Sequence, residues 1–295
     1  MNGELEQLVQ IQNGVLTSGQ ILNLQSRRDF DEDLRTGVLQ RIWQGIYCLG
    51  QPDDHTRLRG LDLGAGTPVP VCLGTAAALY GFDTENPKDL HVLNPTHHQL
   101  RPVDGLVVHR REGAPMTEVD GRPITTAPWT AIEVARSLRR PRALATLDAA
   151  LRSGTCDRVE LVRALARQAR RRGVVAVREL LPLADARAES PMESEARLVM
   201  IDGGLPAPAL QYQIVDGNGD VRRLDFAWPE YRLAAEYDGM DWHSGADAML
   251  ANRKRTSALM DIHWTVVPII FEDVRFRPDD LVARLDAQMR RARAA

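Results

Sequence analysis

The sequence predicts an α+β protein built from more than one domain. Three observations support this class: the chain has 295 residues, helical and strand patterns alternate along it, and 44% of its residues are apolar. A chain of this length exceeds what one hydrophobic core usually holds. We expect three segments, which are residues 1–50, a mixed α/β middle region over residues 51–185, and residues 186–295.

The composition also bears on where the protein works. The chain contains no run of about 18 uncharged apolar residues and no basic segment followed by an apolar one at its start. We therefore expect a cytoplasmic protein with no membrane partner. Cys48, Cys72 and Cys156 stand far apart and form no CxxC pair, which predicts reduced, buried thiols instead of a disulfide framework or a zinc site.

The first segment predicts three short helices followed by a β-hairpin. Thr17 and Gln20 have the spacing of a capping box, and Ser26 is a second N-cap that starts a helix over residues 27–36. The run 38–49 is rich in β-branched, apolar and aromatic residues, with a Gln-Gly turn in its middle. Three helices and a hairpin within fifty residues are the plan of a winged helix-turn-helix.

That plan places the third helix in a major groove of DNA and the hairpin beside the phosphate backbone. Arg27, Arg28, Arg35 and Arg41 are then the residues that contact DNA. The acids within residues 29–33 share this helix, and the segment carries four arginines against six acids, a net charge of -2. Carboxylates repel phosphates, so strong nonspecific affinity is not expected from this segment alone, and a small docking module is the alternative interpretation.

The middle region predicts short strands over residues 90–93 and 106–109, followed by helices. From Arg136 to Arg178 there are twelve arginines against three acids, so this stretch is +9 and the rest of the chain must sum to -12. Such a separation of charge indicates an anionic partner for the middle region, although exposed helices are often charged without binding anything.

One predicted helix of this region carries Arg163, Arg167 and Arg170 at positions i, i+4 and i+7. This spacing places the three arginines on one helix face, where they would add attraction for phosphates. A solvated surface is the alternative interpretation, because no aromatic residue or groove-reading motif is interleaved with them.

The last segment has the most regular order of elements, which we predict to be α-β-β-β-α-β-α. A strong Gly-Asn-Gly turn at residues 217–219 separates the first two strands. The expected helices cover residues 192–202, 246–260 and 279–293, and the expected strands cover residues 210–215, 221–228, 232–238 and 263–270.

Four acidic residues of this segment are predicted to converge. Side chains two residues apart on a strand point the same way, so Glu236 and Asp238 share a face. A hairpin centred between residues 230 and 231 places Asp225 opposite Glu236, and Glu193 begins the preceding helix. Clustered carboxylates favour Mg²⁺ or Mn²⁺, which predicts Asp225 and Glu236 as metal ligands, with all four acids as the catalytic set of a possible nuclease.

The arrangement of these acids is similar to that in the PD-(D/E)XK nuclease superfamily. In this chain Asp238 stands at the position where the superfamily has a lysine. The resemblance implies a restriction-endonuclease-like αβββαβ core, with Lys254 or His243 as the other candidates for the missing basic group. The runs that look like the branch related to very-short-patch-repair endonucleases are residues 190–194, 204–206, 211–212, 225–230 and 236–239.

A second resemblance concerns the beginning of the chain. Gly14-Val15-Leu16-Thr17, the run 41–47 and the run 75–81 look like the winged helix of AbiEi-type antitoxin proteins and its continuation. This resemblance implies a DNA-binding transcriptional regulator that is the antitoxin of a toxin–antitoxin pair, with double-stranded DNA and a nucleotidyltransferase-like toxin as partners.

Three functional interpretations therefore stand side by side. A regulator and antitoxin needs no cofactor, whereas a PD-(D/E)XK nuclease needs Mg²⁺ or Mn²⁺. A protein-binding scaffold that contacts no nucleic acid is the third interpretation.

Overall fold

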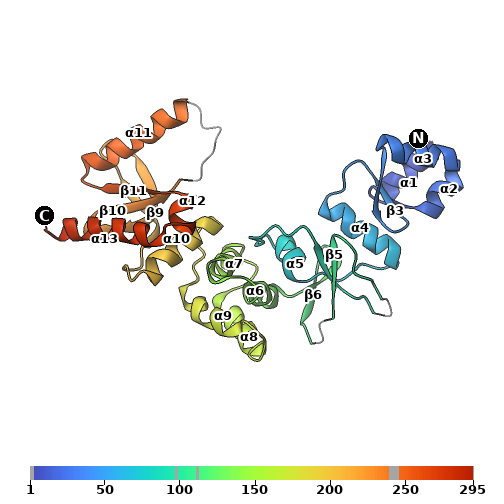
Figure 1. Ribbon diagram of the computed structural model, residues 1–295, viewed down its shortest axis with the longest axis horizontal. Helices are drawn as coiled ribbons and strands as arrows, with labels where there is room; N and C mark the ends of the chain where they lie inside the picture. Colours follow the sequence, from blue (N-terminus) through green and yellow to red (C-terminus); the bar gives the residue numbers. More distant parts are fainter. Residues whose placement is uncertain (1–2, 97–98, 111–112, 239–245, 295) are drawn as a thin grey trace. The chain divides into compact units, whose positions relative to one another are not determined.

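The computed structural model describes residues 3–96, 99–110, 113–238 and 246–294. The chain divides into two compact units, of which unit 1 comprises Met1–Leu79 and Glu85–Thr130, and unit 2 comprises Tyr80–Thr84 and Ala131–Ala295. Both units contain helices and strands, so the predicted α+β class is confirmed (Figure 1). The division at residues 50 and 185 stays a prediction.

Unit 1 begins with three helices and a small antiparallel sheet. The strand order is β1-β3-β2, so the last of the three strands in the sequence lies between the other two. The short strand β1 was not expected from the sequence. The elements are α1 (Gly3–Ile11), β1 (Val15–Thr17), α2 (Ser18–Leu24), α3 (Arg27–Thr36), β2 (Leu39–Trp43) and β3 (Ile46–Leu49).

The predicted helix caps of this part are confirmed. The Thr17 backbone N–H donates to Gln20 Oε1 at 2.8 Å, and Thr17 Oγ1 accepts from the Gln20 backbone N–H at 3.2 Å, which completes the capping box. Ser26 Oγ accepts from the backbone N–H of Asp29, and Gly37 ends α3 in the left-handed conformation, with φ of 77°. The helices bury Leu5, Val9, Leu16, Ile21, Phe30 and Leu39 in one core.

The rest of unit 1 pairs its strands in two small ladders. The two predicted strands are confirmed as β4 (Leu90–Leu93) and β5 (Leu106–His109), which are parallel to each other. Strands β6 (Met116–Val119) and β7 (Arg122–Thr125) form an antiparallel hairpin that the sequence did not predict. The helices of this part are α4 (Asp54–Ala65) and α5 (Leu73–Leu79), and α6 (Ala127–Ala135) follows.

Unit 2 contains a group of helices followed by a sheet. The helices are α7 (Arg140–Arg152), α8 (Arg158–Arg167), α9 (Val174–Leu180) with the 3-10 turn η1 (Leu181–Leu183), and α10 (Pro191–Asp202). Helices α7 and α10 pack against each other closely. The remaining elements are β8 (Ala209–Val215), β9 (Val221–Trp228), η2 (Pro229–Tyr231), β10 (Leu233–Tyr237), α11 (Ala246–Asp261), β11 (Thr265–Ile269), α12 (Phe271–Arg275) and α13 (Pro278–Ala294).

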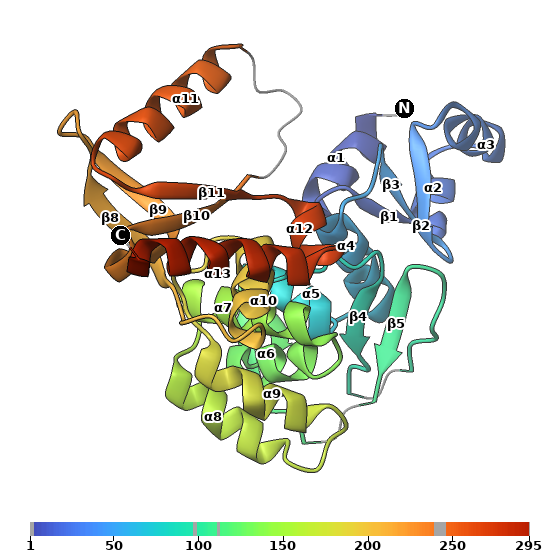
Figure 2. The same cartoon turned by 60° about the vertical axis from the view of Figure 1, so that its left-hand side comes forward.

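The sheet of unit 2 has the strand order β11-β10-β9-β8. Strands β10 and β11 are parallel and the other pairs are antiparallel. Helices α10 and α13 cover one face, where Phe226 and Trp228 are fully buried, and α11 covers the other (Figures 1 and 2). The strands and long helices lie where the sequence predicts them, and only the short α12 was not expected.

Two sequence predictions about the whole chain also meet the structure. Cys48, Cys72 and Cys156 are buried free thiols, as predicted. None of the helices in the described ranges is long and apolar enough to cross a membrane.

Candidate functional site

The arginines predicted to contact DNA are exposed. Arg27, Arg28 and Arg35 lie on α3, and Arg41 lies on β2. Phe30 is the buried residue of α3 and fixes which side of the helix faces the core. Because Arg28 and Arg35 are seven residues apart, they project together on the side away from Phe30.

Two of these arginines also form ion pairs within α3. Arg27 Nε lies 3.1 Å from Asp31 Oδ1, and Arg35 Nη2 lies 2.6 Å from Glu32 Oε1. Exposed pairs of this kind contribute only about 0–1 kcal/mol, so a phosphate could replace the carboxylate as partner. Arg28 forms no ion pair within the part of the chain that the structure describes.

The three arginines predicted to share one helix face are only partly brought together. All three are exposed, but α8 ends at Arg167, so Arg170 lies in the following turn and the prediction of a single helix is wrong at this residue. The reason is local: the backbone N–H of the buried Gln168 donates to the carbonyls of both Ala164 and Leu165, which tightens and ends the last turn.

Part of the positive stretch over residues 136–178 is matched by acids outside it. Glu133, whose side chain is fully buried, accepts from Arg171 Nη1 at 3.0 Å and from Arg136 Nη2 at 3.4 Å. These arginines therefore stabilise the fold of unit 2. The net charge of the stretch is larger than the positive charge that remains available to a binding partner.

Glu195 on α10 is a second buried anion of this kind. Its carboxylate lies 2.6 Å from Arg275 Nη2, 3.2 Å from Arg139 Nη2 and 3.3 Å from Arg142 Nη1. Three guanidinium groups around one buried carboxylate leave that carboxylate no free oxygen for a ligand. Sequence reasoning missed Glu195, because its partners come from two distant parts of the chain, Arg139 and Arg142 before it and Arg275 after it.

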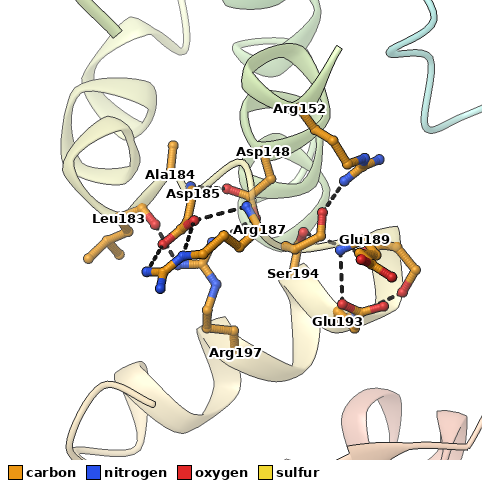
Figure 3. Close-up of polar contacts among 12 residues, drawn as sticks. Asp148, Arg152, Leu183, Ala184, Asp185, Arg187, Glu189, Glu193, Ser194 and Arg197 are labelled. Atoms are coloured by element: carbon orange, nitrogen blue, oxygen red, sulfur yellow. Dashed lines mark hydrogen bonds and ion pairs between the residues drawn. The ribbon is translucent and has the colours of Figure 1, made fainter. Parts of the chain in front are cut away.

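A third buried pair joins α7 to α10 (Figure 3). Arg197 Nη2 lies 2.6 Å from Asp148 Oδ2, and the two side chains are 6% and 0% exposed. Asp148 Oδ1 accepts from the backbone N–H of Asp185 at 2.7 Å, and Arg197 also donates to the carbonyl of Leu183. Burial raises the pKa of Asp148, although Arg197 and these hydrogen bonds oppose the shift.

The hairpin of β9 and β10 has the predicted register. Ala235 pairs with Phe226, so the next position along the hairpin places Glu236 opposite Asp225. Asp225 Oδ2 accepts from the backbone N–H of Tyr237 at 3.0 Å. Burial raises the pKa of both carboxyls, and the charge of Asp225 raises that of Glu236 further.

Arg255 on α11 binds Glu236, one of these two acids. Its Nη1 lies 2.7 Å from Glu236 Oε2 and its Nη2 lies 2.6 Å from Glu236 Oε1, so the contact is bidentate. The Nη2 also donates to the carbonyl of Arg223 at 2.8 Å. Arg255 lowers the pKa of both Asp225 and Glu236, against the larger effect of burial.

Glu193 lies at the start of α10 and belongs to the same electrostatic group. Its Oε2 accepts from the backbone N–H of Glu189 at 2.9 Å and from Gln211 Nε2 at 3.1 Å (Figure 3 shows the first of these contacts). Burial raises the pKa of Glu193, and the charge of Asp225 raises it further. Three of the four predicted acids therefore influence one another.

The other candidates for this site are placed differently. Asp238 follows β10 and is exposed, although it lines the same cavity as Asp225 and Glu236, which has a volume of about 400 Å³. Lys254 is exposed on α11. His243 lies outside the described residues.

The acids can be tested as a site for Mg²⁺ or Mn²⁺. Among the described residues, no group of three His, Cys, Asp or Glu side chains is arranged to hold a metal ion. Both oxygens of Glu236 already bind Arg255, so a divalent cation there would have to displace a guanidinium group. The donor set that the structure describes does not fit a resident metal ion.

Comparison with known proteins identifies a family that matches part of the chain. Residues 69–183 match the family model of the AbiEi antitoxin C-terminal domain. This range contains the run 75–81, one of the three runs that carry the resemblance to AbiEi-type antitoxins. The other two runs precede it, so the likeness of the first fifty residues to a winged helix stays a prediction.

Two relatives extend the comparison to almost the whole chain. The uncharacterized proteins MT2308 and Rv2248, from two strains of Mycobacterium tuberculosis, are each 54% identical over 270 residues, which are 92% of this chain and 99% of theirs. The chain belongs to the same family as these mycobacterial proteins.

Proposed function

We propose that the protein is a DNA-binding transcriptional regulator and the antitoxin of a toxin–antitoxin pair. The observation that carries this proposal is the match of residues 69–183 to an AbiEi antitoxin domain. The element order α1-β1-α2-α3-β2-β3 supports the DNA-binding part, because it is that of a winged helix with α3 as the recognition helix and the β2–β3 hairpin as the wing.

DNA recognition would depend on where the arginine side chains of α3 and β2 are placed more than on the net charge of the first fifty residues. With Phe30 buried, α3 is fixed to its unit, and Arg28 and Arg35 reach base edges or phosphates from its outer side. Arg27 approaches the backbone beside them, and Arg41 on β2 holds the hairpin to a phosphate. The acids of α3 weaken nonspecific binding, so discrimination among sequences is expected to exceed bulk affinity.

A gel-shift titration with the DNA upstream of the protein's own gene tests this proposal. Replacing both Arg28 and Arg35 by alanine is expected to weaken binding at least tenfold, because each arginine contact to a base contributes about 1–3 kcal/mol. Arg290→Ala is the matched control, since Arg290 is equally exposed but lies on α13. Absence of any shift at low salt by the correctly folded wild type would contradict the proposal.

The antitoxin part predicts a toxin partner of the nucleotidyltransferase type, encoded next to this gene, and a cytoplasmic site of action. Co-expression of the protein with that neighbouring toxin in a bacterial host is expected to restore growth. Continued arrest at equal protein levels would contradict the antitoxin assignment without touching the DNA-binding one.

A DNA nuclease is the second candidate, and the juxtaposition of Asp225 and Glu236 is the observation that favours it. The bidentate contact of Arg255 with Glu236 argues against it, because that contact occupies the carboxylate a metal would need. Incubation of plasmid DNA with Mg²⁺ or Mn²⁺ decides the matter. Cleavage that is lost in Asp225→Asn would support the nuclease, and intact plasmid at all metal concentrations would exclude it.

A further inference from the structure

An apolar groove lies between α8 and α9, which run side by side in unit 2 (Figures 1 and 2). Its volume is about 760 Å³, within the range of roughly 300–1,000 Å³ that is typical of ligand sites. Its apolar lining consists of Val162, Leu165, Ala166, Ala169, Leu181 and Pro182. The groove belongs to the residues that match the antitoxin domain.

Exposed apolar side chains lie on both helices that form this groove. Val159 and Val162 on α8 are 55% and 51% exposed, and Val175 on α9 is 61% exposed. Val159 and Val162 are three residues apart and therefore neighbours on one helix face. Valine gains nothing from solvent and is not a strong helix former, so its repeated presence here indicates a surface that another molecule covers.

Two arginines line the groove, and further exposed arginines lie on or just after α8. Arg178 lines one side of it, and Arg163, Arg170 and Arg172 are exposed on or just after α8. Arg158 also lines the groove but is held by the carbonyls of residues 181, 182 and 184, so it contributes shape more than free charge. The apolar lining and the arginines near it together favour a ligand that has both an apolar surface and negative charges.

We propose that this groove binds an amphipathic helix of a partner protein, with apolar residues toward Val162 and acidic residues toward Arg163, Arg170 and Arg178. A helix that lays its apolar face in a groove is a common mode of recognition, and α8, with ten residues, offers a groove about 15 Å long. The inference uses residues of the antitoxin domain but does not depend on DNA binding by α3.

Charge complementarity favours this occupant over a second copy of the chain. A symmetric contact between two copies places the same patch against itself, which would bring these arginines together. Like charges in an interface repel, whereas glutamates along the flanks of a helix would pair with them. Nucleic acid is less suitable, because its phosphates could pair with the arginines but would leave the apolar lining uncovered.

Fluorescence anisotropy with synthetic peptides and the full chain tests the proposal. The probe is a fluorescein-labelled helical peptide of about 15 residues with leucines at i, i+3, i+4 and i+7 and glutamates along both flanks. The control peptide has the same leucines and lysine flanks. We expect the acidic peptide to bind at least tenfold more tightly at low salt and to lose this advantage as salt screens the arginines.

Two variants locate the binding. Val162→Asp is expected to weaken the acidic peptide at least tenfold, and Val221→Asp, at a 67% exposed valine on β9, is the matched control that should not. The double variant Arg163→Glu with Arg178→Glu is expected to reverse the preference toward the lysine peptide. Far-UV circular dichroism and melting curves establish that each variant is folded.

Several results would overturn the proposal. Equal binding of both peptides, or an unchanged affinity in Val162→Asp, would remove the groove as the site. Light scattering that shows a wild-type dimer and a Val162→Asp monomer would assign the groove to a second copy. Binding to vesicles of anionic phospholipid that is lost in Val162→Asp would assign it to a lipid surface.

Discussion

Removing one partner of the Asp148–Arg197 pair should destabilise unit 2 strongly. In Asp148→Ala the Arg197 guanidinium, 6% exposed, keeps its charge but loses the carboxylate that lies 2.6 Å away. Breaking a buried pair from one side costs about 3–5 kcal/mol. For a unit of this size each kcal/mol lowers the melting temperature by about 2–4 °C, so we expect a decrease of roughly 6–20 °C.

Urea unfolding followed by tryptophan fluorescence measures this loss as a change in the midpoint. The matched control is Asp286→Ala, which removes the exposed pair of Asp286 with Arg290 at 2.7 Å and should cost less than about 1 kcal/mol. The double variant Asp148→Leu with Arg197→Met removes both charges, so it should recover most of the stability that Asp148→Ala loses.

Two outcomes would refute this reasoning. A loss below about 1 kcal/mol in Asp148→Ala would mean that Arg197 finds water or another partner in the folded state. A double variant less stable than Asp148→Ala would mean that the side chains stabilise the fold by packing and not by their mutual attraction.

Three further predictions follow from residues elsewhere in the chain. Burial raises the pKa of Asp225, so its protonated form stabilises the fold at low pH, and this contribution is lost as the pH rises through the folded pKa. In urea titrations, the stability of Asp225→Asn relative to the wild type should therefore be higher at pH 8 than at pH 4. A difference in stability that does not change with pH would contradict this. Burial also raises the pKa of Cys156 to about 12, so the native thiol should resist alkylation by iodoacetamide at pH 8 until urea is added. Peptide mass spectrometry measures the alkylation, and rapid labelling of Cys156 in the native protein would refute this prediction. Thr17→Ala removes the capping box with Gln20 and should destabilise unit 1 by about 1 kcal/mol in thermal melts, whereas Thr17→Ser should restore most of the loss.

Local features of the fold could be predicted from the sequence because they depend on neighbouring residues. The caps at Thr17 and Ser26 need only three residues each, and the strand over residues 221–228 has its predicted bounds. The register that places Asp225 opposite Glu236 was predictable for a related reason: a short hairpin has one centre, and that centre fixes every pair along it.

The partners of the acids could not be predicted, because they depend on tertiary packing. Arg255 lies 19 residues from Glu236 in the chain, and Arg197 lies 49 residues from Asp148. Neither spacing corresponds to a repeat of helix or strand, so no periodicity marks the contact. The run of arginines gave a net charge, but only the folded chain separates the arginines that bind Glu195 or Glu133 from those that bind neither acid.

The contact between α7 and α10 has a consequence for the evolution of this family. A gene fragment that ended at Leu183 would encode the whole range matching the antitoxin domain, yet it would omit α10 and with it Arg197 and Glu195. Asp148 would then lose its counterion, and Arg142 would lose a carboxylate. Recombination that joined these residues to an unrelated following segment would bury Asp148 without a counterion, so the two halves of unit 2 are expected to be inherited together.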